Sequence, residues 1–168
     1  MKFTQQLMAE HRVIENMLDI FENKLVEAQA AKNLDMKFFR EFFRFVNEYV
    51  ISYHCVREEK CLFTPLAHRK NLFDERLLEV IEYEHQLGKR KIKELQKTVF
   101  KYSINQAALD DVLNKCIEYL EMLRQHIYKE DRLVFPLSDR IMAEEDQAQA
   151  FECSKRVEEM LSSTFTGV

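Results

Sequence analysis

The residues of this chain best suited to chemistry are histidines and glutamates that recur at regular spacing. Two of the histidines are each followed four residues later by a glutamate. Together with two further histidines they form one set: His11, His54, Glu58, His85, His126 and Glu130. Neutral imidazole and carboxylate are together the ligands of non-haem metal sites. Four of the five histidines enter this pattern, and only His68 lies outside it.

Long helices must position these residues. The chain has only two glycines and two prolines in 168 residues, and so few helix breakers predict long helices joined by short loops. We expect five helices, and their approximate ranges are 4–31, 36–62, 73–102, 103–135 and 139–161. Asp35 should cap the second helix and Asn71 or Asp74 the third. Pro65 and Pro136 should end the second and fourth helices, and residues 162–168 should fray.

Each histidine falls on the apolar face of its helix. Steps of three and four residues keep side chains on one helix face, and His11 follows such steps in the seam Leu7, His11, Ile14, Leu18, Phe21, Leu25. Glu58 and Glu130 continue the seams of His54 and His126, about 6 Å of helix rise away. The segment HCVREEKCLF (54–63) also resembles HIYKEDRLVF (126–135). This repeat predicts a pseudo-twofold bundle in which each half mainly holds one ion.

A metal-free interpretation fits these seams poorly. A lone buried histidine is more often a hydrogen-bonded core residue, and a histidine four residues before a glutamate is common on solvated helix faces. Here, however, both glutamates lie on inward faces, and burying an uncompensated carboxylate is costly. One or two divalent cations in the bundle would remove that cost.

Four segments carry a resemblance to a known family: 8–25, 53–66, 82–95 and 124–136. On these motifs the chain is similar to the hemerythrin family, and most closely to its single-domain HHE cation-binding branch. The resemblance implies an all-α fold, an antiparallel up-down four-helix bundle over residues 1–138, with an additional C-terminal helix and frayed tail over 139–168. It also implies two iron ions bridged by oxide or hydroxide. Glu58 and Glu130 would bridge them, and His11, His54, His85 and His126 would be terminal ligands.

The chain departs from oxygen-carrying hemerythrins at two places. It lacks their second histidine a turn after His85, and it has Cys55 where many relatives have a second histidine. Both departures weaken the case for reversible oxygen carriage. Glycine inside a helix costs about 1 kcal/mol relative to alanine, so Gly88 is either a close-packing residue or leaves space for an exogenous ligand. Glu59, Glu15, Tyr53 and Cys55 are candidate extra ligands, although each is better explained as a neighbour of the site.

Composition excludes several other classes of protein. The net charge of −4 gives no basic stripe for nucleic acid, and no apolar run approaches the ~20 residues of a membrane span. The first ten residues lack a signal-peptide core, so we expect a cytoplasmic protein. In that reducing compartment the four cysteines should be free thiols. Asp131 and Lys129 should be solvated.

Three functions remain open. The first is a non-haem di-iron protein that binds or senses oxygen, nitric oxide or another small gas. The second is a di-iron redox or repair protein that reduces oxygen, peroxide or nitric oxide, or donates iron. The third is an iron-responsive interaction module, for which family precedent is the only support. Manganese and zinc are weaker candidates than iron, since this ligand set exceeds a tetrahedral zinc site. Whether the protein is an enzyme, and which electron or protein partner it has, stays open.

Overall fold

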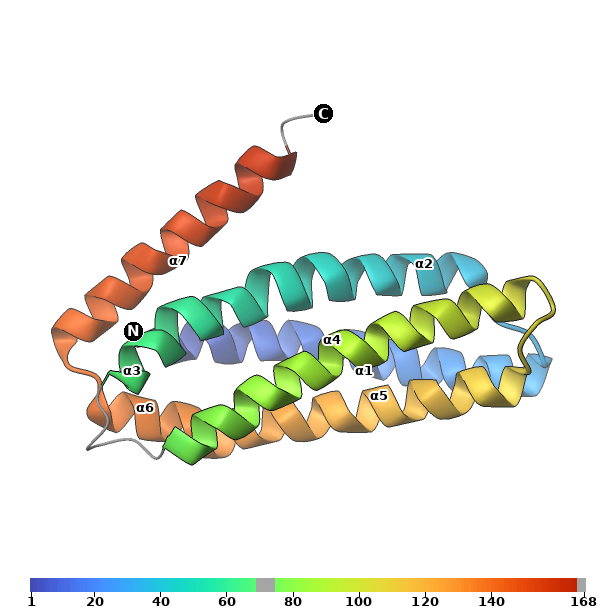
Figure 1. Ribbon diagram of the computed structural model, residues 1–168, viewed down its shortest axis with the longest axis horizontal. Coiled ribbons are helices and arrows are strands. Elements are labelled where there is room, and N and C mark those ends of the chain that lie inside the picture. The colour runs from blue at the N-terminus through green and yellow to red at the C-terminus, as the bar shows by residue number, and fades with distance from the viewer. Residues whose placement is uncertain (69–74, 166–168) are drawn as a thin grey trace.

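The computed structural model describes residues 1–68 and 75–165, in which all regular secondary structure is helical. In this part of the chain, helical segments that follow one another without a loop form five rods (Figure 1). Three rods are single helices: α1 (Phe3–Ala31), α4 (Glu75–Ser103) and α7 (Glu144–Phe165). The second rod joins α2 (Met36–Phe45), η1 (Val46–Cys55), η2 (Glu58–Phe63) and α3 (Thr64–Ala67). The fourth joins α5 (Leu109–Lys129), η3 (Glu130–Val134) and α6 (Phe135–Ile141).

The first four rods alternate in direction and pack around a shared core (Figure 1). Helix α4 pairs with α5, α1 packs on α5 and η1, and α7 lies on the outside against η2, η1 and α1. This arrangement confirms the predicted antiparallel four-helix bundle with an additional C-terminal helix. Within the described residues, no helix is both long enough and apolar enough to cross a membrane.

The structure confirms one predicted helix boundary and corrects another. The Asp35 side chain caps α2 by accepting a hydrogen bond from the Phe38 backbone N–H at 3.0 Å. Pro136, in contrast, does not end the fourth rod, because α6 continues to Ile141, and the last helix starts at Glu144 rather than 139. A register change in η3 makes Pro136 part of the first turn of α6. Proline is tolerated in a first turn, where its missing N–H is not needed.

Some expectations fall partly or wholly on residues that the structure leaves undescribed. The proposed caps Asn71 and Asp74, and the first residues of the expected third helix, lie outside the described residues. At the C-terminus α7 extends to Phe165, so part of the segment expected to fray is helical. Residues 166–168 again lie outside the description.

The hydrophobic core consists of two clusters with a polar layer between them. On α1, Leu7 belongs to one cluster and Ile14 to the other, and His11 lies between them. On α4, His85 likewise separates Ile81 from Ile92. The layer thus crosses the bundle at one level and is closed off by apolar side chains on both sides.

The glutamates of the set lie where helices depart from α-helical geometry. Glu58 begins η2 and Glu130 begins η3, and both segments are π-helical. In a π-helix the N–H group bonds the carbonyl five residues back, as Thr64 does to Glu59 and Phe135 to Glu130. Such wider turns often occur at functional sites. They place two consecutive acidic side chains of each rod near the polar layer.

Candidate metal centre

Six buried side chains from four rods meet in the polar layer. They are the six residues singled out by the sequence pattern, and each is at most 6% exposed: His11, His54, Glu58, His85, His126 and Glu130. Each histidine directs Nε2 at a glutamate of the layer. The closest approaches are 3.2 Å, from His54 Nε2 to Glu58 Oε1 and from His11 Nε2 to Glu130 Oε2. His126 Nε2 lies 3.3 Å from Glu130 Oε2. His68 lies elsewhere, with Nδ1 against the Thr64 carbonyl.

The six residues form two groups that share both glutamates. One group contains His11 and His54 and the other contains His85 and His126, while Glu58 and Glu130 belong to both. In each group the candidate ligand atoms all lie within 4.8 Å of one another. Glu58 contacts one histidine of each group: its Oε1 lies 3.2 Å from His54 Nε2 and its Oε2 lies 3.3 Å from His85 Nε2. The geometry is consistent with a two-metal centre in which the carboxylates lie between the ions.

The layer contains polar atoms that the protein itself leaves unsatisfied. Among the described residues, six buried atoms have no hydrogen-bond partner: both carboxylate oxygens of Glu58, both of Glu130, and Nε2 of His11 and of His85. Each buried, unpaired polar group costs about 1–3 kcal/mol, and more when it is charged. Cations bound between these atoms would satisfy all six at once. Imidazole and carboxylate together suit iron and similar transition metals.

The electrostatics of the layer show what replaces a cation when none is bound. Burial alone would lower the pKa of His11, but Asp131, Glu130 and Glu58 outweigh it and raise that pKa well above 6.5. Burial likewise opposes protonation of His85, and the Cys55, Glu130 and Glu58 side chains nevertheless raise its pKa. Burial would raise the pKa of Glu58, yet the neighbouring histidines hold it well below 4.5. The raised histidine pKa values and the lowered Glu58 pKa both favour an imidazolium beside a carboxylate, so a metal ion would compete with protons for these side chains.

Every histidine of the layer also contacts a second carboxylate through Nδ1. The pairs are His11 with Asp131 at 2.6 Å, His54 with Glu10 at 2.8 Å, His85 with Glu59 at 2.8 Å and His126 with Glu84 at 3.0 Å. A carboxylate only accepts, so Nδ1 carries the proton and Nε2 is the ring atom available to a metal. Outer partners of this kind orient metal-bound imidazoles and raise their basicity.

Each outer carboxylate is in turn paired with a cationic side chain. The pairs are Asp131 with Arg12, Glu10 with Arg57, Glu59 with Lys89 and Glu84 with Lys129. Their burial differs: the Arg57 side chain is 2% exposed, whereas that of Lys129, its counterpart in the other half, is 38% exposed. At these two equivalent positions the repeat therefore keeps a cationic side chain but changes its access to solvent.

One of these outer residues contradicts the sequence analysis. Asp131 was expected to be solvated, but it is 11% exposed and contacts His11 on α1 from within the π-helical segment η3. Lys129, also expected to be solvated, is 38% exposed and is paired with Glu84. A usable signal was present, since acidic residues stand beside the site residues in both halves: Glu10 before His11, Glu84 before His85, Glu59 after Glu58 and Asp131 after Glu130.

The four candidate extra ligands occupy different places. Glu59 bonds His85 from outside the layer, and Tyr53 accepts a hydrogen bond from Arg57 at 2.8 Å. Glu15 pairs with Arg12 at 3.0 Å on the surface. Cys55 is buried next to the layer and is free. None of the four belongs to the two ligand groups found among the described residues.

The prediction that all four cysteines are free is wrong for two of them. Cys61 and Cys153 form a disulfide that links η2 to α7 across 92 residues of sequence. Cys55 and Cys116 are free and buried, as expected. Since α7 folds back onto the bundle, the pairing depends on tertiary packing and leaves no trace in the sequence spacing.

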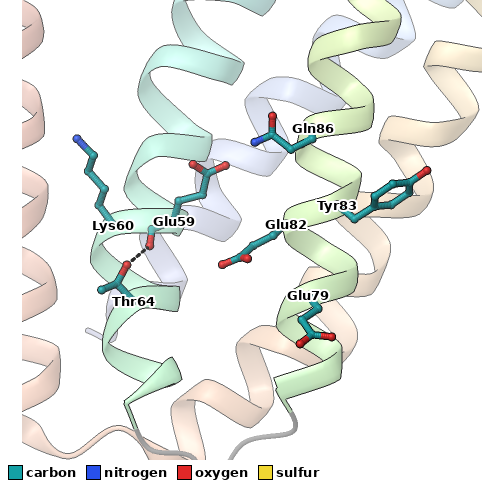
Figure 2. Close-up of a pocket in the computed structure, with 7 residues that line it drawn as sticks. All are labelled: Glu59, Lys60, Thr64, Glu79, Glu82, Tyr83 and Gln86. Carbon is teal, nitrogen blue, oxygen red and sulfur yellow. Dashed lines mark hydrogen bonds between the residues drawn. The ribbon is translucent and has the colours of Figure 1, made fainter.

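A groove of about 510 Å³ runs along the surface next to His85. Figure 2 shows Glu59 and Thr64 on one wall and Glu82 and Gln86 on the α4 wall. Through Glu59 this groove reaches within one side chain of the layer. Gly88 lies a turn further along α4, and a Cβ built there would be in ordinary van der Waals contact with Met122 Cε, at 3.5 Å.

Comparison with known proteins agrees with this site. Residues 2–138 match the family model of the hemerythrin HHE cation binding domain. The chain is also 28% identical over 152 residues to proteins of Mycobacterium bovis and Mycobacterium tuberculosis that are described as uncharacterized. These alignments cover 88% of this chain and 59% of each relative, so the chain spans less than two thirds of their length. No solved structure matches the chain significantly.

Proposed function

This chain belongs to the hemerythrin HHE cation-binding family, and from that premise we propose that it holds a non-haem di-iron centre that binds or senses oxygen or another small gas. The observation that carries the proposal is the pair of ligand groups sharing Glu58 and Glu130. Each group offers two imidazoles and two shared carboxylates, so each ion would have about four protein ligands. Two adjacent irons would supply a redox-active pair of Lewis acids able to take up a diatomic ligand.

The chain's own residues would hold and shield that pair. Glu58 and Glu130 would bridge the ions, and His11, His54, His85 and His126 would bind them terminally through Nε2. Phe135 stacks on the His11 ring at 5.3 Å between centroids, and Phe63 lies 6.1 Å from His85. Both rings are 1% exposed, so they exclude water from one side of the layer. The two phenylalanines occupy equivalent positions in the repeated segments 54–63 and 126–135.

The exogenous ligand would enter on the His85 side. The outer carboxylates of this half are the more exposed, with Glu59 30% and Glu84 15% exposed against 11% for Asp131 and 9% for Glu10, and the groove of Figure 2 adjoins it. Gly88 lies on α4 with His85, and a Cβ there would meet one atom within 4 Å, Met122 Cε. We therefore place Gly88 at the ligand-binding space, where a larger side chain would narrow it.

Elemental analysis and absorption spectroscopy test the proposal. Protein purified without added metal should contain about two irons per chain, and the reduced protein should change its spectrum when mixed with oxygen. A change that reverses on removing oxygen supports binding or sensing, whereas rapid one-way oxidation supports the redox alternative. Protein that binds two zinc ions in preference to iron under iron-replete growth contradicts the di-iron assignment.

A further inference from the structure

The C-terminal helix is covalently attached to the rod that carries two of the site residues. The disulfide joins Cys153 of α7 to Cys61, which lies three residues after Glu58. Cys61 is fully buried, whereas Cys153 is partly exposed. An attacking thiolate would therefore meet the Cys153 sulfur first and release the Cys61 sulfur as the leaving group.

The residue that follows the disulfide in α7 contacts a buried arginine. Arg57 Nε donates a hydrogen bond to Ser154 Oγ at 2.9 Å, and both residues are almost fully buried. The other guanidinium nitrogens donate to Gln6 Oε1 at 2.9 Å and to the Tyr53 hydroxyl at 2.8 Å, and one also binds Glu10. Ser154 thus supplies a direct hydrogen bond from α7 to a guanidinium group whose three nitrogens all donate, and Glu158 of α7 accepts a hydrogen bond from Tyr53 beside it at 3.4 Å.

Arg57 connects α7 to the candidate metal centre. It holds Glu10, whose other oxygen lies 2.8 Å from His54 Nδ1. His54 Nε2 faces Glu58 in the layer. A continuous chain of contacts therefore runs from Ser154 through Arg57 and Glu10 to His54. In the opposite half, Glu84 is held by Lys129, which is 38% exposed.

We propose that Cys61 and Cys153 form a reversible thiol–disulfide site. Its redox state sets how firmly α7 holds Arg57, and Arg57 in turn sets the affinity of the centre for metal through Glu10 and His54. The inference rests on the metal centre of the proposed function. Its substrate class is a dithiol reductant, either a protein or a small molecule. The dithiol gives two electrons and two protons: its two thiols become one disulfide, and the Cys61–Cys153 bond becomes two thiols.

The arrangement of the other cysteines keeps this exchange confined to one pair. Cys116 is fully buried in the apolar cluster on the far side of the layer, and burial raises the pKa of its thiol. It is therefore a poor nucleophile toward the disulfide. Cys55 is also buried. Reduction of the pair should free α7 from its covalent link, allow water to reach Arg57, and weaken the support of Glu10 for His54.

The test compares metal release from oxidised and reduced protein. Cobalt(II) serves as the probe, because its visible spectrum reports coordination and the thiol reductant does not change its charge. The metal-free protein is reduced with dithiothreitol, freed of reductant without air, and loaded with cobalt. Release to EDTA should be about tenfold faster than from the oxidised protein, the lower end of the 10–100-fold effect of losing outer partners.

Three variants separate the proposed coupling from general damage. Cys153→Ser should release cobalt as fast as the reduced parent and should not respond to dithiothreitol. Cys116→Ala, the matched control, should keep the full response. Ser154→Ala keeps the disulfide but breaks the contact to Arg57, so it should speed release when oxidised and respond less to reduction, as expected for coupled residues. Circular dichroism should show the same helix content in all of them.

Two results would overturn the inference while leaving the centre intact. The first is equal cobalt release from the oxidised parent, the reduced parent and Cys153→Ser, which would make the disulfide only a structural link. The second is a disulfide that dithiothreitol reduces only after the protein unfolds. A failure of the oxidised parent to bind two cobalt ions would overturn the proposed centre itself, and this inference with it.

Discussion

Replacing Glu58 with glutamine tests the bridging role directly. The change keeps side-chain size and removes the charge, and it affects both halves of the layer because the two oxygens face His54 at 3.2 Å and His85 at 3.3 Å. Glutamine has a single, uncharged acceptor oxygen, so one ion would lose a ligand and the other would exchange a carboxylate for a weaker neutral donor. We expect bound metal to fall from about two ions per chain to well under one.

The loss of metal affinity expected for Glu58→Gln can be estimated by comparing Glu58 with the next residue, Glu59. Loss of an outer partner weakens metal binding about 10–100-fold, which is about 1.4–2.7 kcal/mol per ion. Removing the charge of an inner ligand should weaken metal binding by more than this, and at Glu58 the change affects both ions. Glu59→Gln is the matched control, since Glu59 is the next residue and contacts only the Nδ1 side of His85. It should retain two ions with reduced affinity.

The assay is elemental analysis after dialysis, together with the absorption spectrum of the iron-loaded protein. Circular dichroism must first show that Glu58→Gln is folded. Loss of a single ion would mean that Glu58 is a terminal ligand of one half. Retention of two ions with an unchanged spectrum would refute the reasoning altogether.

The remaining predictions concern protons, stability and ligand access. Since the pKa values of His11 and His85 are raised, metal binding at pH 7 should release about two protons per chain, which calorimetry in two buffers counts; no release would contradict the protonated layer. In the metal-free protein, the raised pKa of His11 contributes stability below pH 6.5, and this contribution is lost as pH rises through the folded pKa; the lowered pKa of Glu58 contributes stability above pH 4.5, and this is lost as pH falls through its folded pKa. The free energy of unfolding, measured with urea, should therefore be largest between pH 4.5 and 6.5. Metal affinity should instead increase with pH. At metal concentrations of about 100 times Kd, two bound ions should add about 5.4 kcal/mol to the free energy of unfolding. Removing the metal with a chelator should therefore lower Tm by about 15 °C, and an unchanged Tm would argue against the metal centre. Gly88→Leu should keep iron but bind azide more slowly than the parent in stopped-flow experiments. The control Gly88→Ala, whose Cβ would lie 3.5 Å from Met122 Cε, should bind azide as fast as the parent. If Gly88→Leu binds azide at the same rate as Gly88→Ala, Gly88 is only a packing residue.

The sequence was sufficient for the inner layer because inward-facing helix seams are periodic. Steps of three and four residues brought His11 and His85 to one level, and the structure places both between the same two apolar clusters. The outer carboxylates were harder to predict. Asp131 contacts His11 from within the π-helical segment η3, and a local departure from α-helical geometry of this kind has no hydrophobic period that would reveal it.

Long-range contacts account for the other differences. The disulfide partners are separated by 92 residues, and they meet because α7 returns to the outside of η2. Arg57 stands in a run of charged residues, yet α7 and Phe3 pack against it: Ser154 of α7 accepts its Nε hydrogen bond, and the guanidinium lies 5.5 Å from the Phe3 ring. Contacts of this kind depend on the path of the last helix, which the sequence pattern did not specify.

The symmetry of the bundle explains both the shared glutamates and the unequal halves of the layer. Repeated segments supply equivalent inner ligands, so two glutamates of equivalent position can lie between two histidine pairs. Helix α7 has no counterpart in this repeat, and it covers only the half in which Arg57 holds Glu10. On the other side Glu84 and Lys129 remain accessible to water. A symmetric core would therefore offer two ions alike ligand sets, while the added helix buries Arg57 in one half and Lys129 of the other half stays 38% exposed.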